Sequence, residues 1–383
     1  MKIFIKIIIF VCVIGLFNVS QLLAENKIRI GLLVPITGEH KEIGKSIIKS
    51  MRLAVNKIDN SLLEIIPKDT KSKPETTLRS AKELYAQGIR IIIGPVFNKN
   101  LIYLDELSEI IFLSLTNKVI DNPKNIISAG INAESQLRTI LEFQKLNSLK
   151  KTVILIPKEN YKNEIEKAIK DSKVKNKKVF YYDSDPTKLT KQIEKLTKYN
   201  QRKQNVKDKI KRLKNSNEAN KDKKIKQLEK IDTIGNIGFD SVIISDFDEK
   251  LKSITTSLLY TDVSPKNINF ITLNQWFDKS LLTEKSSQPI YFPSINKENY
   301  EKFIEDYYEI YNEYPNQLSF LSYDLFGLVY YLIVKNNFII DEKMFLKKNK
   351  FKGKIGIFEI KNNKVKHVLN FYKVENGIFK KIF

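Results

Sequence analysis

The chain has very few of the residues that carry covalent chemistry and cross-links. Its 383 residues include a single cysteine, Cys12, and two histidines, His40 and His367. One cysteine cannot form a disulfide within the chain, so an ordinary hydrophobic core has to hold the fold. Nucleophilic catalysis needs a nucleophile beside a base, and the scarcity of cysteine and histidine leaves few candidates. We therefore expect a protein that is not an enzyme and has no catalytic residues.

Metal and acid–base sites are not indicated either. Lys41 separates His40 from Glu42, and its positive charge makes this triplet a poor set of metal ligands. Asp246 and Asp248 form a carboxylate pair, but general acid–base catalysis needs a specific pocket. We interpret this pair as part of a solvated loop after a strand, and we expect no metal and no cofactor.

The first residues have the pattern of a secretory signal peptide. Two lysines come before an apolar run over residues 7–17, and the small residue Ala24 follows at a distance suited to cleavage. A retained anchor helix is the alternative, but the run is shorter than the roughly 20 residues of a membrane span. Cys12 lies inside the run, without the small residues of a lipoprotein site. We expect residues 1–24 to be removed on export to the periplasm.

Positive charge is in large excess. Lys and Arg number 66 against 44 Asp and Glu, which gives +22, or 64 − 44 = +20 without the two lysines of the signal peptide. Nucleic acid is not expected as a partner, because the protein is exported and no Arg and aromatic stacking platform stands out. The chain is also rich in residues that A/T-rich codons favour, so genome composition explains much of the charge. The alternative is attraction to an anionic envelope surface.

The order of the apolar segments indicates an α/β fold. Residues 28–34, IRIGLLV, have the composition of a buried strand, and residues 42–59 have apolar side chains at helical spacing. This alternation repeats, which favours mainly parallel sheets covered by helices. It occurs in two series, and the chain exceeds the roughly 250–300 residues at which a single core stops growing. We expect two α/β/α lobes with a cleft between them.

The C-terminal third is expected to contribute to both lobes. Residues 318–336, LSFLSYDLFGLVYYLIVKN, are almost wholly apolar and predict a buried helix. The tail predicts β-hairpins with turns at Asn362-Asn363 and Asn376-Gly377. We assign these late helices to the first lobe and the hairpins to the second, which requires a three-segment hinge. The predicted domains are residues 25–130 and 294–350 for lobe I, and residues 131–293 and 351–383 for lobe II.

Residues 188–232 differ from the rest of the chain in their charge and in their thin apolar stripes. The spacings of three and four predict a charged helical hairpin inserted in lobe II, with its tip at residues 215–220. Between Lys198 and Lys230 there are 13 Lys and Arg against 4 Asp and Glu. Two interpretations stay open, a solvated pair of helices and a docking arm. The stripes are Leu189/Ile193/Leu196, Val206/Ile210/Leu213 and Ile225/Leu228/Ile231.

The stretch TGEHKEIGKS, residues 37–46, ends like a phosphate-binding loop. Such a loop has four residues between its two glycines, whereas five separate Gly38 from Gly44. We therefore expect no nucleotide site and interpret Gly44 as a residue that the turn requires. A helix N-terminus in this lobe could still offer N–H groups to a carboxylate.

Several segments resemble type I periplasmic binding proteins of the leucine/isoleucine/valine-binding kind. Residues 27–59, KIRIGLLVPITGEHKEIGKSIIKSMRLAVNKID, have Pro-x-Thr-Gly after a strand, and residues 88–98, GIRIIIGPVFN, form a strand that ends in Gly-Pro. The match covers nearly the whole mature chain and implies two α/β/α lobes, a hinge and a cleft. Later segments are similar to the penicillin-binding protein activator branch of this family: IIFLSLTNKVID, LEKIDTIGNIGFDSVIISD, LNQWFDKSLL and FIEDYYEIYNEYPNQLSFLSYDLFGL.

The resemblance also implies which residues line the cleft. Most of them follow the C-terminal ends of strands, where α/β sheets bind ligands. A core position is the alternative for Trp276, the only tryptophan. We interpret Tyr323 and Asp324 as a structural pair at the lobe core or hinge, because a buried aspartate needs a partner. The implied ligand-binding residues are Pro35, Thr37, Pro95, Phe97, Asn98, Ser114, Thr116, Asn117, Tyr161 and Trp276.

Two functions follow from the resemblance. One is a non-enzymatic envelope protein that engages a cell-wall synthase, another envelope partner or a small ligand at its cleft. The other is the solute-binding component of a branched-chain amino-acid-type ABC transporter. Amino-acid binders of this kind have small hydroxyl residues in two first-lobe loops, whereas this chain has Phe97-Asn98-Lys99 and, at residues 114–118, SLTNK. We expect weak binding of free amino acids, because Phe97 would crowd the α-carboxylate.

Overall fold

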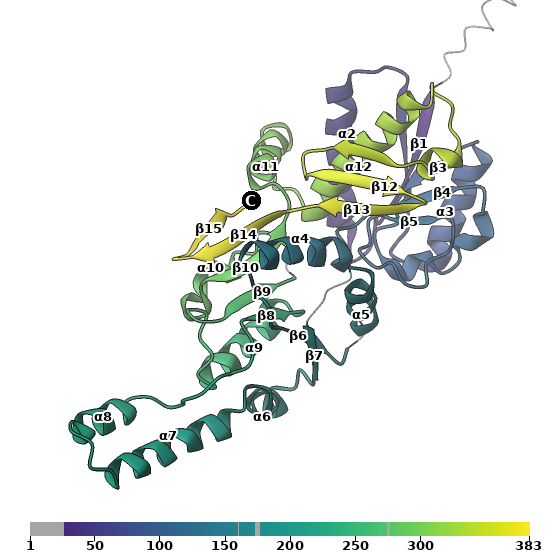
Figure 1. Cartoon of the computed structure of the whole chain (residues 1–383). Helices are drawn as coiled ribbons and strands as arrows, with labels where there is room; N and C mark the ends of the chain where they lie inside the picture. Colours follow the sequence, from purple (N-terminus) through teal and green to yellow (C-terminus); the bar gives the residue numbers. More distant parts are fainter. Residues whose placement is uncertain (1–26, 160, 173–176, 274–275) are drawn as a thin grey trace, which may run out of the picture.

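The computed structural model describes residues 27–159, 161–172, 177–273 and 276–383, so the predicted signal peptide lies outside the described residues. The chain forms two lobes, each built around its own sheet, and a helical hairpin projects from the second lobe (Figure 1). Strands near the C-terminus form a third, smaller sheet. The two mainly parallel sheets, covered by helices, confirm the predicted α/β fold class.

The first lobe contains a five-stranded parallel sheet with the strand order β2-β1-β3-β4-β5. Six of the seven side chains of its strand β1 are buried and only Arg29 is exposed. A parallel strand covered on both faces reads as a nearly continuous apolar run, which is why the sequence located this strand correctly. The strands are β1 (Ile28–Val34), β2 (Leu63–Asp69), β3 (Ile91–Ile93), β4 (Ile111–Ser114) and β5 (Ile126–Ser128).

Helices from both ends of the sequence pack in this lobe (Figure 1). Two short 3-10 turns follow β3. The helices are α2 (Lys41–Ile58), α3 (Pro74–Ala86), α11 (Lys297–Tyr311) and α12 (Gln317–Lys335), and the 3-10 turns are η1 (Asn98–Leu101), η2 (Leu104–Leu107) and η4 (Glu342–Phe345).

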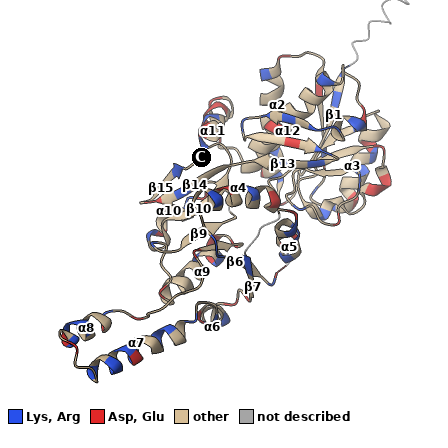
Figure 2. Ribbon diagram, viewed as in Figure 1, with Lys and Arg blue, Asp and Glu red and all other residues tan. Residues whose placement is uncertain are grey.

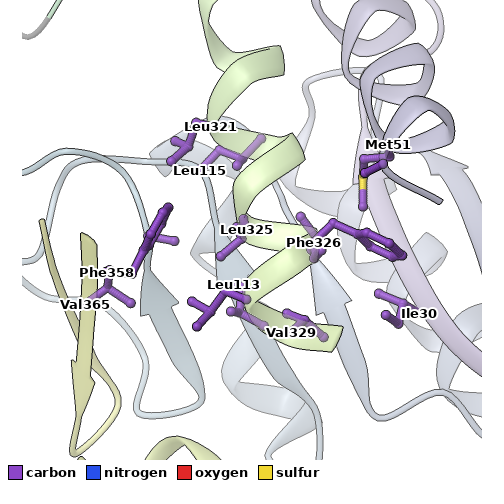
Figure 3. Close-up of a cluster of buried hydrophobic side chains, with 14 of the residues drawn as sticks. Ile30, Met51, Leu113, Leu115, Leu321, Leu325, Phe326, Val329, Phe358 and Val365 are labelled. Carbon is purple, nitrogen blue, oxygen red and sulfur yellow. The ribbon is translucent and has the colours of Figure 1, made fainter. Parts of the chain in front are cut away.

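Helix α12 forms the centre of the first-lobe core. Its residues Phe326 and Val329 are fully buried among side chains such as Met51 of α2 and Ile30 of β1 (Figure 3). Among the described residues it is the one helix long and apolar enough to cross a membrane, but most of it is buried inside the lobe. This burial confirms the prediction of a buried helix at residues 318–336.

The second lobe contains a seven-stranded sheet with the order β15-β14-β10-β9-β8-β6-β7. The five strands from β10 to β7 are parallel, whereas β14 and β15 are antiparallel additions at one edge. The strands are β6 (Thr152–Pro157), β7 (Lys177–Tyr182), β8 (Ser241–Ile244), β9 (Asn269–Thr272), β10 (Ile290–Ser294), β14 (Asn370–Glu375) and β15 (Ile378–Lys381). The helical elements here are α4 (Ala133–Leu146), α5 (Lys162–Asp171), α6 (Pro186–Thr197), α9 (Asp248–Tyr260), α10 (Ser280–Thr283) and the 3-10 turn η3 (Lys285–Ser287).

The third sheet corrects our assignment of the C-terminal hairpins. Strands β11 (Asn349–Lys352), β12 (Ile357–Lys361) and β13 (Lys364–Val368) are antiparallel, and their apolar side chains join the first-lobe core. Residues 351–368 therefore lie with lobe I, not with lobe II. The physical reason is that the apolar face of β12 and the apolar side of α12 that faces it shield each other from water. The residues of this sheet in that core are Phe358, Ile360 and Val365.

Three chain segments connect the lobes. They follow β5, follow β10, and run through Leu369 between β13 and β14, so the third crossing lies later than the position near residue 350 that we expected. Asp324 of α12 accepts a hydrogen bond from the N–H of Ile355 at 2.5 Å, and the carbonyl of Ile355 accepts one from the N–H of Asn296, 2.8 Å away. Asp324 thus has a structural role beside the second crossing.

The helical hairpin is present, with α7 (Tyr199–Lys214) and α8 (Lys221–Leu228) joined at the predicted tip. The second apolar stripe packs against Ile225 and Leu228 of the third between these helices, whereas Ile231 is exposed. The first stripe instead belongs to α6 and is buried in the second-lobe core, so the projecting hairpin begins near Lys198 and not at residue 188. Lys198 has a left-handed conformation, φ 54°, which separates α6 from α7.

Candidate functional site

A hollow of about 430 Å³ lies between the lobes. Its first-lobe wall comes from the loops after β3 and β4, from His40 before α2 and from the start of α12, and Gly130 and Ile131 of the first crossing form its base. Trp276, after β9, contributes from the second lobe. A volume of this size is within the usual range for small-ligand sites.

Two aromatic side chains dominate the hollow. The Phe97 ring lies 4.7 Å from the ring of His40, centroid to centroid, and the Nζ atom of Lys99 lies 6.0 Å from the Phe97 centroid. Trp276 packs against the edge of the first-lobe core, with its ring 6.3 Å from the ring of Tyr300. Trp276 therefore combines both positions that we considered, because it packs on the core and lines the hollow.

The polar lining of the hollow is basic or neutral. Asn98, Thr116 and Asn117 reach it, together with Lys99 and Lys118. None of the described residues that line it is acidic. Thr116 already accepts a hydrogen bond at its Oγ1 atom from the N–H of Lys118, 3.2 Å away. The hollow thus offers positive charge and amide groups to an occupant, but no carboxylate.

Ser114 and Pro95 lie behind this wall. The Ser114 hydroxyl donates a hydrogen bond to the carbonyl oxygen of Pro95 over 2.8 Å, and Ser114 is fully buried. The structure therefore uses this serine to join the ends of β3 and β4. Neither residue is part of the lining of the hollow.

Pro35 and Thr37 form a separate loop near the start of α2. The Thr37 hydroxyl donates a hydrogen bond to Asp69 Oδ2 at 2.6 Å, and the N–H of Ile36 donates one to Asp69 Oδ1 at 2.8 Å. A Cβ atom on Gly44 would lie 1.8 Å from the Pro35 carbonyl oxygen, so this position needs glycine. The stretch that ends like a phosphate loop therefore uses its second glycine for a close backbone approach, and the loop does not line the hollow.

Tyr161 belongs to a carboxylate cluster on the second lobe. Its hydroxyl and that of Tyr182 both donate hydrogen bonds to the carboxylate of Asp246. Burial raises the pKa of Asp246 above its usual value, although these two hydrogen bonds act in the opposite direction. The pKa of both tyrosines is raised, mainly by burial and to a smaller extent by the contact with Asp246.

This cluster corrects our interpretation of Asp246 as part of a solvated loop, because its exposed fraction is 1%. A sequence signal existed: Asp246 directly follows the buried segment SVIIS at the C-terminal end of β8, where ligand sites of α/β sheets occur. The burial itself depends on Tyr161 and Tyr182, which are distant in sequence. Tyr161 is thus held within its own lobe and does not line the hollow.

The structure brings five of the ten candidate residues together around the hollow. Their role in ligand binding stays a prediction. The five that line it are Phe97, Asn98, Thr116, Asn117 and Trp276, and the five that do not are Pro35, Thr37, Pro95, Ser114 and Tyr161. The candidate residues did not include His40, Lys99 and Lys118, which also line the hollow, although Lys99 and Lys118 belong to the two loops that we compared with amino-acid binders.

His367 lies beside the first crossing. Its Nε2 atom is 2.9 Å from the carbonyl oxygen of Ala129, and its backbone N–H donates a hydrogen bond to Ser135 Oγ at 3.0 Å. Burial lowers its pKa to about 4, although the backbone groups of Ala129 and Gly130 act to raise it. In the part of the chain that the structure describes, no group of three or more His, Cys, Asp and Glu side chains is placed to hold a metal ion.

Comparison with known proteins supports the resemblance read from the sequence. A family model described as periplasmic binding protein matches residues 27–196. None of the curated protein sequences compared with the chain matches it. The family description and the similar solved structures are of binding or regulatory proteins.

The similar structures include both kinds of protein that the resemblance implied. The C-domain of LpoA from Haemophilus influenzae, a regulator of PBP1A, is 14% identical, with a TM-score of 0.61 over 93% of this chain and 100% of that chain. A branched-chain amino acid ABC transporter ligand-binding protein from Burkholderia xenovorans is 11% identical, with a TM-score of 0.66 over 93% and 95%. A leucine-binding protein, LivK, from Thermotoga maritima is 15% identical, with a TM-score of 0.56 over 93% and 98%. The chain therefore has the type I periplasmic-binding-protein fold.

Proposed function

We propose that the protein is a non-enzymatic binding protein of the periplasm that engages a cell-wall synthase or another envelope partner at its inter-lobe cleft. The observation that carries this proposal is the lining of the hollow, in which Phe97 and Trp276 are combined with Lys99 and Lys118 and with no acidic residue among those described. Aromatic side chains such as these two are typical anchors for protein partners. The similarity to the LpoA C-domain supports the same class of function.

Free amino acids fit this hollow poorly. An α-ammonium group needs an acceptor, and none of the described residues that line the hollow has a carboxylate. Ser114, which could have bound an α-carboxylate, donates its hydroxyl to Pro95 instead. Each lost charge-assisted hydrogen bond costs about 1.5–3 kcal/mol, so two would weaken binding by roughly two to four orders of magnitude.

The second candidate is the solute-binding component of an ABC transporter. It is supported by the likeness to two amino-acid-binding proteins over more than nine tenths of the chain and by the size of the hollow. If the protein has this function, Lys99 and Lys118 favour an anionic solute with an apolar body, which Phe97 and Trp276 would contact. Asn98, Thr116 and Asn117 would supply the hydrogen bonds.

Calorimetry on refolded, ligand-free protein separates the two functions. We expect no binding tighter than about 100 µM for any of the twenty amino acids. Micromolar binding of one of them would overturn the proposal in favour of transport. The partner is tested in a peptidoglycan synthesis assay with a purified class A synthase from the same organism. Phe97→Ala and Trp276→Ala should reduce any stimulation, whereas Ile102→Ala, at an exposed position outside the hollow, should not.

A further inference from the structure

The α7–α8 hairpin projects from the second lobe at the end farthest from the first lobe (Figure 1). Arg202, at its base, is buried and donates hydrogen bonds to the carbonyl oxygen of Thr261 at 3.1 Å and to Thr233 Oγ1 at 2.6 Å. Farther out, the two helices bury apolar side chains against each other. The hairpin is thus an ordered arm fixed to the second lobe.

This arm holds a disproportionate share of the charge. Residues 198–230 contain 13 Lys and Arg against 4 Asp and Glu, an excess of +9. The chain from residue 25 onward has 64 − 44 = +20, which leaves +11 for all its other residues. Codon preference acts along the whole sequence, so it does not explain why less than a tenth of the chain has nearly half of the net charge.

The lysines of α7 form a stripe along one side of the helix. Lys207, Lys211 and Lys214 have spacings of four and three, which place them on one face, and much of the α7 ribbon is blue in Figure 2. All three are exposed, and none has an ion-pair partner among the described residues. Elsewhere on the arm, Lys203 pairs with Asp232 at 3.3 Å and Lys224 with Glu218 at 2.6 Å.

Helix α2 is a comparison, because three of its four lysines have ion-pair partners. There, Lys45 pairs with Glu42 at 3.2 Å, and two further lysines pair with carboxylates near or on α11. Such partners are missing from the stripe on α7 in this fully described stretch. The stripe is therefore a concentrated, uncompensated positive surface, which attracts an extended anionic one.

The composition of the arm selects among anionic partners. Its apolar side chains are used between α7 and α8, and Ile231 is the only large apolar residue exposed in residues 198–232. Protein interfaces have aromatic anchors and are depleted of lysine, and single-stranded nucleic acid binds on aromatic platforms. A lysine surface without either feature fits the diffuse negative charge of lipid headgroups.

We propose that the α7–α8 hairpin is a docking arm for an anionic phospholipid bilayer. The lysines at 207, 211 and 214 contact lipid phosphates electrostatically, without insertion of apolar side chains. The arm lies away from the hollow between the lobes, so membrane contact leaves the hollow accessible (Figure 1). This inference does not depend on the occupant of the hollow.

Vesicle sedimentation tests the arm. The protein without its signal peptide should bind vesicles of equimolar phosphatidylglycerol and phosphatidylcholine at low salt, and not pure phosphatidylcholine. A lysine near an anionic surface contributes roughly a fivefold increase in partitioning, so K207Q/K211Q/K214Q should bind about 100-fold more weakly. The matched control K73Q/K302Q/K347Q removes the same charge from exposed, unpaired first-lobe lysines and should bind like the wild type.

Several results would overturn the proposal: no binding to the anionic vesicles, equal binding to both lipid compositions, or equal losses in the two triple variants. Hairpin-dependent binding to polyglutamate without vesicle binding would also overturn it and would identify an acidic polypeptide as the partner. Circular dichroism and urea unfolding check that the variants fold. Phe97→Ala should bind vesicles like the wild type, which separates this test from the proposed function of the hollow.

Discussion

Two aspartates at the C-terminal ends of strands, one in each lobe, are used in opposite ways. Asp69 ends β2 in the first lobe and accepts hydrogen bonds from the backbone of residues 36, 37 and 71 and from the Thr37 hydroxyl. Asp246 follows β8 in the second lobe, and both of its carboxylate oxygens accept from tyrosine hydroxyls. Asp69 is partly exposed, whereas Asp246 is buried.

The two environments change the pKa in opposite directions. Burial acts to raise the pKa of Asp69, but the hydrogen bonds from Thr37, Lys71 and Ile36 together hold it below its usual value. At Asp246 burial outweighs the tyrosine hydrogen bonds and raises the pKa. A carboxylate that orders a solvated loop thus gains from its charge, whereas one that ties three elements together inside a lobe is costly to ionise.

The largest effect should come from Asp246→Ala. The substitution leaves the hydroxyls of Tyr161 and Tyr182 buried without their acceptor, at about 2 kcal/mol each, so the free energy of unfolding should fall by about 4 kcal/mol. Urea unfolding at neutral pH measures this loss. Tyr161→Phe, which removes one donor and leaves the other in place, should cost less than half as much. A loss under about 1 kcal/mol for Asp246→Ala would show that water replaces the carboxylate.

The dependence of stability on pH in acid also includes a contribution from His367, which lies beside the first crossing between the lobes. Burial lowers the pKa of His367 from 6.5 to about 4, so between these values the unfolded state binds a proton that the folded state does not. Stability should therefore fall as pH falls through this window, by up to about 3 kcal/mol. Asp324 acts in the opposite direction, because burial raises its pKa to about 6 and stability falls as pH rises from about 4 to 6.

His367→Gln separates these contributions. It removes the histidine titration, so the variant should lose less stability than the wild type between pH 6.5 and pH 4, as measured by urea unfolding across that range. Equal slopes in the wild type and His367→Gln would contradict the buried, neutral state of His367.

Much of the fold could be predicted from the sequence because its strands are buried on both faces. The apolar run at residues 28–34 has the pattern of a parallel strand that helices cover on both faces. The almost wholly apolar residues 318–336 have the pattern of a buried helix. The helical hairpin was also predictable, since its stripes repeat at helical spacing. Each of these elements could be recognised from the spacing of apolar residues within its own segment.

The placement of the C-terminal hairpins was not predictable in the same way. The strands β12 and β13 have an alternating apolar face, and that pattern is the same for whichever lobe covers it. In the structure Phe358 and Val365 pack beside α12, and this placement depends on tertiary contacts that the strand pattern does not specify. The apolar stripe at Leu189 and Ile193 similarly predicted a helix correctly. It did not predict that this helix packs on the second-lobe core and not in the hairpin.

The candidate site shows the same limit. The resemblance to type I periplasmic binding proteins implied Phe97, Asn98, Thr116 and Asn117, which follow the C-terminal ends of β3 and β4 and line the hollow. The direction of a side chain depends on its nearest partner, however, and Ser114 turns to a backbone carbonyl 19 residues away. The burial of Asp246 depends on residues 64 and 85 positions away, which no local pattern shows.

Asp69→Asn should have a moderate effect that depends on pH with the sign opposite to that of Asp246. The asparagine keeps an oxygen for the backbone N–H groups but loses the charge and the second oxygen, which accepts from Thr37. At neutral pH we expect a loss of about 1 kcal/mol. Because the folded pKa is lowered, the wild type loses this advantage as pH falls below about 3.8, so the two proteins should converge in acid. A difference that grows in acid would contradict the lowered pKa.

The smallest effect should come from Thr37→Val, which removes one hydroxyl from the same loop. The hydrogen bond to Asp69 Oδ2 is short, 2.6 Å, but both groups are accessible to water, which can replace it. We therefore expect a loss of only about 0.5 kcal/mol in urea unfolding. In the Asp69→Asn background the same substitution should cost nothing further, because the Oδ2 acceptor is already gone, and the double-mutant cycle measures this coupling. An equal cost in both backgrounds would mean that Thr37 orders the loop by packing and not through Asp69, and the contrast between the two carboxylates would then rest on Asp246 and the backbone contacts of Asp69 alone.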